Sequence, residues 1–435
     1  MTLHAGIAVA SLAAILASSM GFIDGSVISI ATPAIRADLG ASLFDAQWVS
    51  NAYLLMLSSV LLLGGAAGDR FGIRNVFAGG IVVFVLASLA SALSPTPTLL
   101  IVARAVQGLG AAFMVPLSLA LIARAYPRDE RGAAIGIWSS ASSFFTIAGP
   151  IAGGAALTTL GDWGWRVVFA VNLPLGGIAL FLLLTQVRRD EPDRSRPLDV
   201  AGAGLSMVAL LLLCLAFTLD GELTMRLLPG GAGILIALLF LWWETRTPHP
   251  MVPLALFRDR AFSGAQSLTF ALYFSLAAIS FYLPTTLIAG WGISPAEVSF
   301  VLLPMGILLT ILSPQAGKLA DRVGPGPMIA AGSLLVAASF LLLGLTAGAH
   351  QVWSIVLPLM VLFGLGMSLV VSPLSTAVMT SVADRDPGTA SGINTAVARV
   401  AGLFAVASMG GLAAIVFAHD LGADGAGQSF GAPLP

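Results

Sequence analysis

The chain has 435 residues, of which 57% are hydrophobic and 9% are charged, and its net charge is −1. Soluble domains carry about 25% charged residues, so this composition excludes a water-soluble globular protein and gives no sign of nucleic-acid binding. The one cysteine, Cys214, excludes an intrachain disulfide, and the four histidines have no metal-ligand spacing. We therefore expect a polytopic α-helical membrane protein without an organic cofactor or a metal.

Thirteen apolar segments are long enough to be membrane helices, each near the 20 or so residues that cross hydrocarbon. In chain order they are 7–33, 46–67, 75–93, 98–123, 132–156, 166–186, 199–219, 228–243, 262–289, 295–316, 327–346, 352–379 and 388–418. If the N-terminus is cytoplasmic, 15 of the 20 Lys and Arg residues fall in inward loops and three in outward loops. Cytoplasmic loops are enriched in basic residues, so this orientation in the cell membrane is predicted.

Two short motifs occur twice along the chain. "GDRFG" at 68–72 ends the second apolar segment, and "ADRVG" at 320–324 ends the tenth, 252 residues later. "GAAIG" at 132–136 opens the fifth segment, and "GTASG" at 388–392 opens the thirteenth, 256 residues later. The order and the similar offsets indicate duplicated halves. Internal repeats are typical of secondary transporters, whose substrate site lies between the repeats.

The repeat is shifted by eight helices, two more than a six-plus-six transporter needs. We predict a six-helix bundle over 1–187, a linker with two inserted helices over 188–260, and a second bundle over 261–435. The second bundle has five apolar segments. The 17 residues after about 418 are polar and Gly-rich, so we expect the last helix of that bundle to be missing.

Four motifs carry a resemblance to a known family. They are "DGSVISIATP" (24–33), "GAAGDRFGIR" (65–74), "RAVQGLGAA" (104–112) and "GPIAGG" (149–154). In this order they resemble the helix-one, loop, helix-four and antiporter motifs of the major facilitator superfamily, and within it the fourteen-helix drug:proton antiporter family. "WGWRVVFAVNLP" (163–174) and "PMVPLALFRDRAF" (250–262) are also typical of that family. Ile73, Pro325 and Gly326 depart from its basic loop positions.

The resemblance implies an all-α fold of two pseudo-repeats and proton-coupled export of small amphipathic compounds by alternating access. The proton would be the coupling ion, and the partners would be the lipid bilayer and a small-molecule substrate, with the chain a monomer. Two alternatives stay open: a dedicated exporter of one endogenous metabolite or lipid, and a truncated membrane protein that does not transport. No nucleophile–base pair or phosphate loop is apparent, so an enzyme is not expected.

Asp24 is the sharpest candidate site residue, because it lies deep in the first apolar segment. A carboxylate in hydrocarbon is costly and is by default functional, and desolvation favours its protonated form. Arg104 lies in the fourth segment, with Gln107 three residues later on the same helix face. The resemblance implies a part in proton coupling for Asp24 and Arg104. A purely structural role stays open for each, including a tie between the two helices.

Two further groups are expected to act in conformational change. Gly149, Pro150, Gly153 and Gly154 give a kink with small side chains, which allows close approach to a helix of the other half. The resemblance links this motif to antiport; tight packing alone is the alternative. The duplicated loop is expected to form a cytoplasmic latch, unless its charges only set the topology. Its residues are Gly65, Asp69, Arg70, Gly72 and Arg74, with Asp321 and Arg322 in the second half.

A substrate cavity is the weakest prediction. Its candidate residues are Gln107, Phe270, Tyr273, Phe274 and Arg399. An aromatic wall binds apolar or cationic compounds, although such residues more often face lipid or the protein core. Arg399 is also placed to extend its charge to the cytoplasmic end of its helix.

Overall fold

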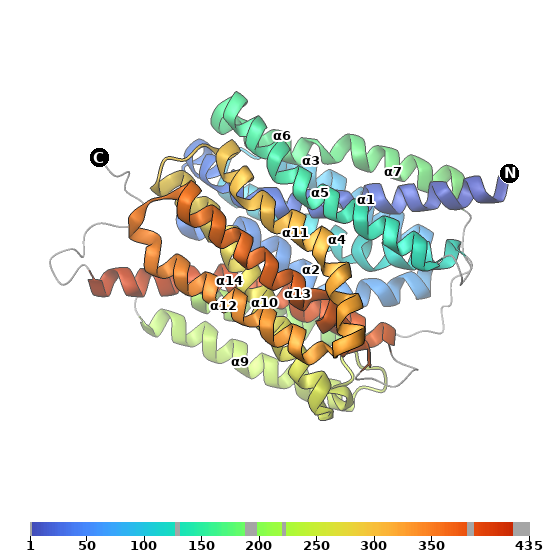
Figure 1. Ribbon diagram of the computed structural model, residues 1–435. Helices are drawn as coiled ribbons and strands as arrows, with labels where there is room; N and C mark the ends of the chain where they lie inside the picture. The colour runs from blue at the N-terminus through green and yellow to red at the C-terminus, as the bar shows by residue number, and fades with distance from the viewer. Residues whose placement is uncertain (1, 127–130, 188–197, 220–222, 381–386, 421–435) are drawn as a thin grey trace.

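The computed structural model describes residues 2–126, 131–187, 198–219, 223–380 and 387–420, and within them it is all-helical. Figure 1 shows long helices lying side by side along one common direction. Twelve described segments are long and apolar enough to cross a membrane, so the chain is a multi-pass membrane protein. The prediction of thirteen helices differs in count because only the short turn Gly161–Gly164 follows α5, so that one apolar segment is counted from Phe144 to Gln186.

Seven helices form what we call the first bundle. They are α1 (Thr2–Leu39), α2 (Leu43–Phe71), α3 (Ile73–Ala92), α4 (Pro97–Ala125), α5 (Arg131–Leu160), α6 (Trp165–Ala170) and α7 (Asn172–Gln186). Within it α4 packs on α2 and α3, and α1 packs on α4, α5 and α7. The predicted sixth helix is divided into α6 and α7 at Val171, three residues before Pro174, which has no N–H to donate.

Five helices form the second bundle. They are α10 (Arg260–Thr285), α11 (Pro295–Val323), α12 (Pro325–Thr346), α13 (Leu357–Thr380) and α14 (Pro387–Asp420). Within it α13 packs on α11 and α12, and α10 packs on α14. Residues 421–435 of the predicted polar tail lie outside the described residues, as does the whole linker segment 188–197.

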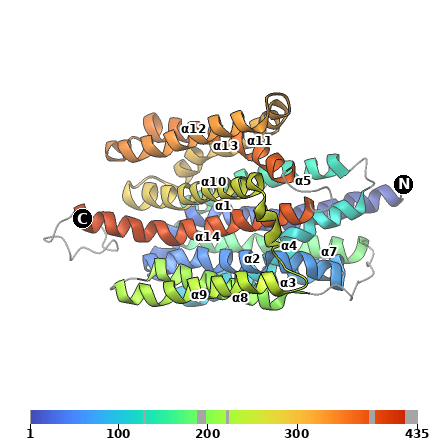
Figure 2. The ribbon, with the colours of Figure 1, turned by 90° about the horizontal axis from the view of Figure 1, so that it is seen from below.

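The inserted helices α8 (Val200–Thr218) and α9 (Leu223–Arg246) pack on each other at one edge of the molecule. In Figure 2, α11, α12 and α13 lie at the opposite edge, and α1, α5, α10 and α14 lie between them and α2. Of the inserted pair, α8 contacts α2 and α14, and Trp48 of α2 donates its indole N–H to Thr218 at 3.0 Å. α8 therefore bridges the two bundles, which also contact each other directly, chiefly through α5 with α11 and α2 with α14.

The predicted repeat is confirmed where the helices cross. A Cβ at Gly80 of α3 would lie 3.1 Å from the carbonyl oxygen of Gly110 in α4, and one at Gly110 would lie 2.9 Å from the carbonyl oxygen of Gly80, so the two backbones approach closely through glycine. Gly332 of α12 and Gly366 of α13 meet in the same way, with 2.5 Å and 2.7 Å for the corresponding distances. These residues lie 252 and 256 positions after Gly80 and Gly110, the two offsets of the sequence motifs.

The offset of 252 also relates a smaller detail. The capping box of Ser42 and Asp45 at the start of α2 is repeated by Ser294 and Glu297 at the start of α11. A side-chain oxygen at the N-cap satisfies a free helix N–H, so both helices begin at the same kind of signal. The two bundles therefore share their helix starts as well as their crossings.

Candidate functional site

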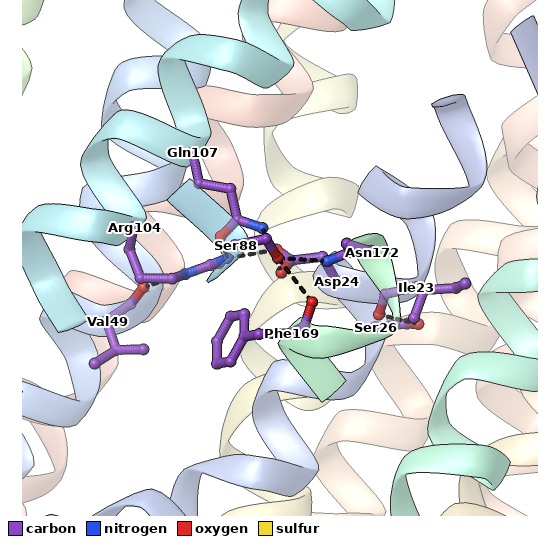
Figure 3. Close-up of polar contacts among 9 residues, drawn as sticks. All are labelled: Ile23, Asp24, Ser26, Val49, Ser88, Arg104, Gln107, Phe169 and Asn172. Atoms are coloured by element: carbon purple, nitrogen blue, oxygen red, sulfur yellow. Dashed lines mark hydrogen bonds and ion pairs between the residues drawn. The ribbon is translucent and has the colours of Figure 1, made fainter. Parts of the chain in front are cut away.

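Asp24 of α1 and Arg104 of α4 form an ion pair in the middle of the first bundle, with 2.6 Å between the Arg104 Nη1 and the Asp24 Oδ2 (Figure 3). Each residue is 1% exposed. Taking two charges out of water is costly, and a buried pair persists only where further hydrogen bonds satisfy both groups. The structure therefore pairs Asp24 with Arg104, in place of the expected single acid in apolar surroundings.

Arg104 donates its remaining hydrogen bonds to a backbone carbonyl and a side-chain amide. Its Nε donates to the carbonyl oxygen of Val49 at 3.0 Å, and its Nη1 also donates to the Gln107 Oε1 at 2.7 Å. The Gln107 Nε2 donates to the other oxygen of Asp24 at 3.2 Å. The guanidinium carbon lies 4.4 Å from the centre of the Tyr53 ring, within cation–π range. The carboxylate, the guanidinium and the amide thus form one closed, buried unit.

Tyr53 also lines a small cavity. The residues that line it are Ser18, Gly21, Phe22, Tyr53, Val115, Trp138 and Arg399. The first six come from α1, α2, α4 and α5 of the first bundle, whereas Arg399 comes from α14 of the second. Trp138 donates its indole N–H to Ser18 at 3.1 Å. The cavity therefore lies between the bundles, with the Tyr53 ring as its contact with the buried ion pair.

The motif 149–154 contacts two helices with different residues. A Cβ at Gly149 would lie 2.7 Å from the Ser26 Oγ of α1, and one at Gly153 would meet Val27. On the opposite face, a Cβ at Gly154 would lie 2.8 Å from the carbonyl oxygen of Pro295 in α11. The small residues therefore bring α5 against α1 and, as predicted, against a helix of the other bundle.

A hydrogen bond closes that contact between the bundles. The Ser299 hydroxyl of α11 lies 2.8 Å from the carbonyl oxygen of Pro150 and also 2.8 Å from that of Pro295 in its own helix, so its one proton is shared between the two acceptors. In Figure 1, α5 and α11 lie together at this end and diverge toward their other ends, Arg131 and Val323. The two bundles are thus joined at one end of the molecule by the motif itself.

Comparison with known proteins identifies the fold and the family. The chain matches the Major Facilitator Superfamily over residues 14–406. It belongs to that superfamily. The multidrug resistance protein Stp of Mycobacterium tuberculosis (strain CDC 1551 / Oshkosh) is 31% identical over 404 residues, which cover 91% of this chain and 74% of Stp. The tetracenomycin C resistance and export protein of Streptomyces glaucescens is 34% identical over 402 residues, covering 90% of this chain and 73% of the relative.

Solved structures agree on the fold. A POT family transporter in complex with 5-aminolevulinic acid superposes with a TM-score of 0.69 at 15% identity, covering 97% of this chain and 100% of that one. A D-xylose-proton symporter superposes with a TM-score of 0.66 at 17% identity, covering 94% and 90%. The predicted resemblance to the superfamily and its drug:proton antiporter family is confirmed. Family and fold indicate a transporter and not an enzyme.

The predicted latch residues lie where the superfamily fold turns from one helix to the next. Gly72, between α2 and α3, has φ of 91°, and Gly324, between α11 and α12, has φ of 84°. Residues other than glycine rarely adopt a positive φ. Gly65 belongs to the last part of α2, and Arg322 is exposed near the end of α11. The side chains of Asp69 and Asp321 lie outside the described residues, so the latch stays a prediction.

Two arginines of the first loop have described contacts. The Arg70 guanidinium lies 5.5 Å from the centre of the Phe71 ring. Arg74 is buried, and it donates from Nε to the Leu183 carbonyl at 3.3 Å and from Nη2 to the Leu184 carbonyl at 2.5 Å. These carbonyls belong to the last turn of α7, where a positive charge is favourable. Arg74 therefore ties α3 to α7 inside the first bundle, in addition to its predicted place in the latch.

The predicted aromatic wall lies on α10. Phe270 is 37% exposed and its ring centre lies 6.3 Å from that of Phe404 in α14 and 6.2 Å from that of Phe274. Phe404 in turn packs edge-on against Phe217 of α8. Tyr273 is half-buried. Of the predicted cavity residues, Arg399 lines the cavity beside Tyr53, and Gln107 belongs to the buried unit around Asp24. A role for Phe270, Tyr273 and Phe274 in substrate binding stays a prediction.

Sequence reasoning missed the outer part of the buried polar unit. Ser88 of α3 and Asn172 at the start of α7 are fully buried and hydrogen-bonded to each other at 2.9 Å, and Ser88 also accepts from the Gln107 Nε2 at 3.3 Å (Figure 3). The available signal was the family-typical segment 163–174, which contains Asn172. For Ser88 no sequence signal existed, since serine is common in apolar helices.

Proposed function

We propose that this chain is a proton-coupled antiporter that exports small amphipathic compounds by alternating access. The observation that carries the proposal is the buried Asp24–Arg104 pair, separated by Tyr53 from a cavity between the bundles. An ionisable residue in a membrane helix is a functional-site hypothesis by default. The names of several relatives support drug export, among them the multidrug resistance protein Stp and the probable actinorhodin transporter of Streptomyces coelicolor.

Proton exchange at Asp24 would proceed through its ion pair. A proton that binds a carboxylate oxygen of Asp24 removes the negative charge, and the Arg104 guanidinium loses its partner. A buried, unpaired guanidinium is unfavourable, so the two bundles shift to an arrangement in which it finds other acceptors. When the proton leaves on the other side of the membrane, the ion pair re-forms. One acid exchanges one proton per cycle, driven electrically by about 2.3 kcal/mol per charge per 100 mV.

Access would alternate by rocking of one bundle against the other. Ser299 and Gly154 join α11 to α5 at one end only, which leaves the other end of this seam free to differ. With the N-terminus in the cytoplasm of the cell membrane, as the basic loops favour, the joined end faces outward and substrate is loaded from the cytoplasm. In this proposal the chain works as a monomer, and the duplicated loop at 68–74 latches the cytoplasmic end in the opposite state.

A dedicated exporter of one compound is the second candidate. Two relatives are named for single compounds: the tetracenomycin C protein, and the riboflavin transporter RibZ of Clostridioides difficile (strain 630), which is 29% identical over 372 residues, 85% of this chain and 80% of RibZ. The two candidates share the fold and the buried acid. They differ in how many unrelated compounds compete for transport, which a panel of dyes and antibiotics would measure.

Substrate-driven proton movement in proteoliposomes tests the proposal. A fluorescent amphipathic dye is loaded against a proton gradient, with an internal pH indicator as the second readout. Asp24→Asn keeps the shape and removes the titratable group, so we expect dye transport to become independent of the gradient or to stop. The matched control is Asp45→Asn, which changes a half-buried acid in the capping box of α2. Wild-type rates of gradient-driven transport in Asp24→Asn would contradict the proposal.

A further inference from the structure

The segment 163–174 has a role that its resemblance to the family leaves unassigned. Its inner end reaches the buried ion pair: the Phe169 ring lies 5.6 Å from the Arg104 guanidinium carbon, and Asn172 donates to Ser88 at 2.9 Å. Its outer end holds α1, because Trp165 donates to the Asp38 carboxylate at 3.0 Å and Arg166 forms an ion pair with it. The segment thus touches both the closed end of α1 and the polar unit around Asp24.

Ser88 links this segment to the ion pair through three hydrogen bonds, and we call it the hub. Its hydroxyl donates to the Phe169 carbonyl at 3.0 Å, and this bond uses the one proton of the hydroxyl. It then accepts from the Gln107 amide at 3.3 Å and the Asn172 amide at 2.9 Å (Figure 3). A hydroxyl has one proton to give and two lone pairs, so the three bonds use its whole capacity. Ser88 can therefore present only an acceptor to Gln107.

This acceptor fixes which way the Gln107 amide points. With Nε2 toward Ser88 and Asp24, its Oε1 faces the Arg104 guanidinium at 2.7 Å. The flipped amide would place an oxygen against the Asp24 carboxylate and against a hydroxyl with no proton to spare, and an NH₂ group against the guanidinium. Each of the three contacts would be unfavourable. Ser88 thus adds a third, neutral contact to the two charged groups that favour this orientation of the amide.

The second bundle shows that the fold does not need these polar atoms. At the positions that correspond to Ser88 and Gln107 by the repeat offsets stand Phe340 and Phe363, whose rings pack edge to face at 5.7 Å. The glycine crossing beside them is the same in both bundles. Because an apolar pair fills this place elsewhere in the molecule, Ser88 serves the buried charges.

We propose that Ser88, supported by Asn172, is a positioning residue that sets the proton affinity of Asp24 by orienting the Gln107 amide. The inference rests on the proposed proton coupling and names the residues that tune it. The Oδ1 of Asn172 is buried and has no hydrogen-bond partner among the described residues, so this amide has a free acceptor for a water molecule or an incoming proton donor beside the hub.

Proton binding by Asp24 can be followed without a substrate. The purified protein in lipid is titrated by infrared difference spectroscopy, and the carboxylic-acid carbonyl band that Asp24→Asn removes is assigned to Asp24. In Ser88→Ala the amide loses one of its three contacts and is held less firmly, so its donation to the carboxylate weakens and the acid binds its proton more tightly. We expect the midpoint to move up by about one pH unit, a tenfold change in proton affinity. Asn172→Ala should move it in the same direction by less.

Ser91→Ala is the matched control. It removes an equally buried hydroxyl from the same helix, and that hydroxyl has no hydrogen-bond partner among the described residues. An unchanged midpoint in both Ser88→Ala and Asn172→Ala, or an equal shift in Ser91→Ala, overturns the inference while leaving proton coupling intact. If the wild type shows no band that Asp24→Asn removes, the proposed coupling fails and the inference fails with it. Should Ser88→Ala not fold, Asn172→Ala decides alone.

Discussion

The crossing of α3 with α4 and the crossing of α12 with α13 are built on the same glycines but carry different chemistry. Gly80 and Gly110 meet backbone to backbone in the first bundle, as Gly332 and Gly366 do in the second. The neighbouring positions are Ser88, Arg104 and Gln107 in the first, and Phe340, Met360 and Phe363 in the second.

The difference teaches that the scaffold and the charge site are separable. Met360 and Phe363 are fully buried in an apolar core, and α13 contains no charged residue at all. The second bundle needs only packing at this crossing, whereas the first keeps an ion pair that costs desolvation. A stable transporter half therefore exists without the pair, which favours a functional reason for retaining it in the other half.

The largest expected effect comes from placing the second bundle's residue in the first. Arg104→Met leaves the Asp24 carboxylate buried without its cation, which costs on the order of 3–5 kcal/mol. We expect a strongly lowered thermal unfolding midpoint in lipid or detergent and no gradient-driven transport. The double variant Asp24→Asn/Arg104→Met removes both charges, so most of the stability should return while the coupling stays lost. Equal destabilisation of the single and double variants would contradict the ion-pair argument.

A smaller effect is expected from a methyl group at each glycine crossing. In Gly110→Ala the Cβ would lie 2.6 Å from the Phe84 backbone nitrogen, and in Gly366→Ala 2.7 Å from the Gly332 carbonyl oxygen. Overpacking of this kind costs about 1–3 kcal/mol, so both variants should unfold at lower temperature by similar amounts. Gly79→Ala is the control, because no atom lies within 4 Å of its added Cβ, and it should be neutral or stabilising. Tolerance of one crossing and not the other would break the equivalence of the bundles.

The smallest effect is expected at the repeated capping boxes. Ser42→Ala and Ser294→Ala each remove a side-chain acceptor from the first turn of α2 and α11, worth about 1 kcal/mol. The two variants should lower the thermal unfolding midpoint slightly and equally, and leave the pH dependence of transport unchanged. A clear difference between them would show that the outer ends of α2 and α11 contribute unequally, for example through the Ser299 contact on α11.

Much of the fold follows from the chain itself. Apolar length gives the membrane helices, and the two motifs at offsets of 252 and 256 give the repeat, because both signals are local. Asp24 and Arg104 are recognisable for the same reason: a charge in an apolar segment is conspicuous without knowledge of its neighbours. The boundary between α5 and α6 is less conspicuous, since only the four-residue turn Gly161–Gly164 separates them.

What only the tertiary structure decided is the identity of the partners. The hydrogen bonds of Ser88 join residues 19, 81 and 84 positions apart, and the contact of Pro150 with Ser299 spans 149. Such pairs depend on which helix faces cross and at what depth, and a single serine or glycine in an apolar helix carries no mark of its partner. The sequence by itself determined the class, the repeat and the buried charges; helix packing determined which neutral groups hold those charges in place.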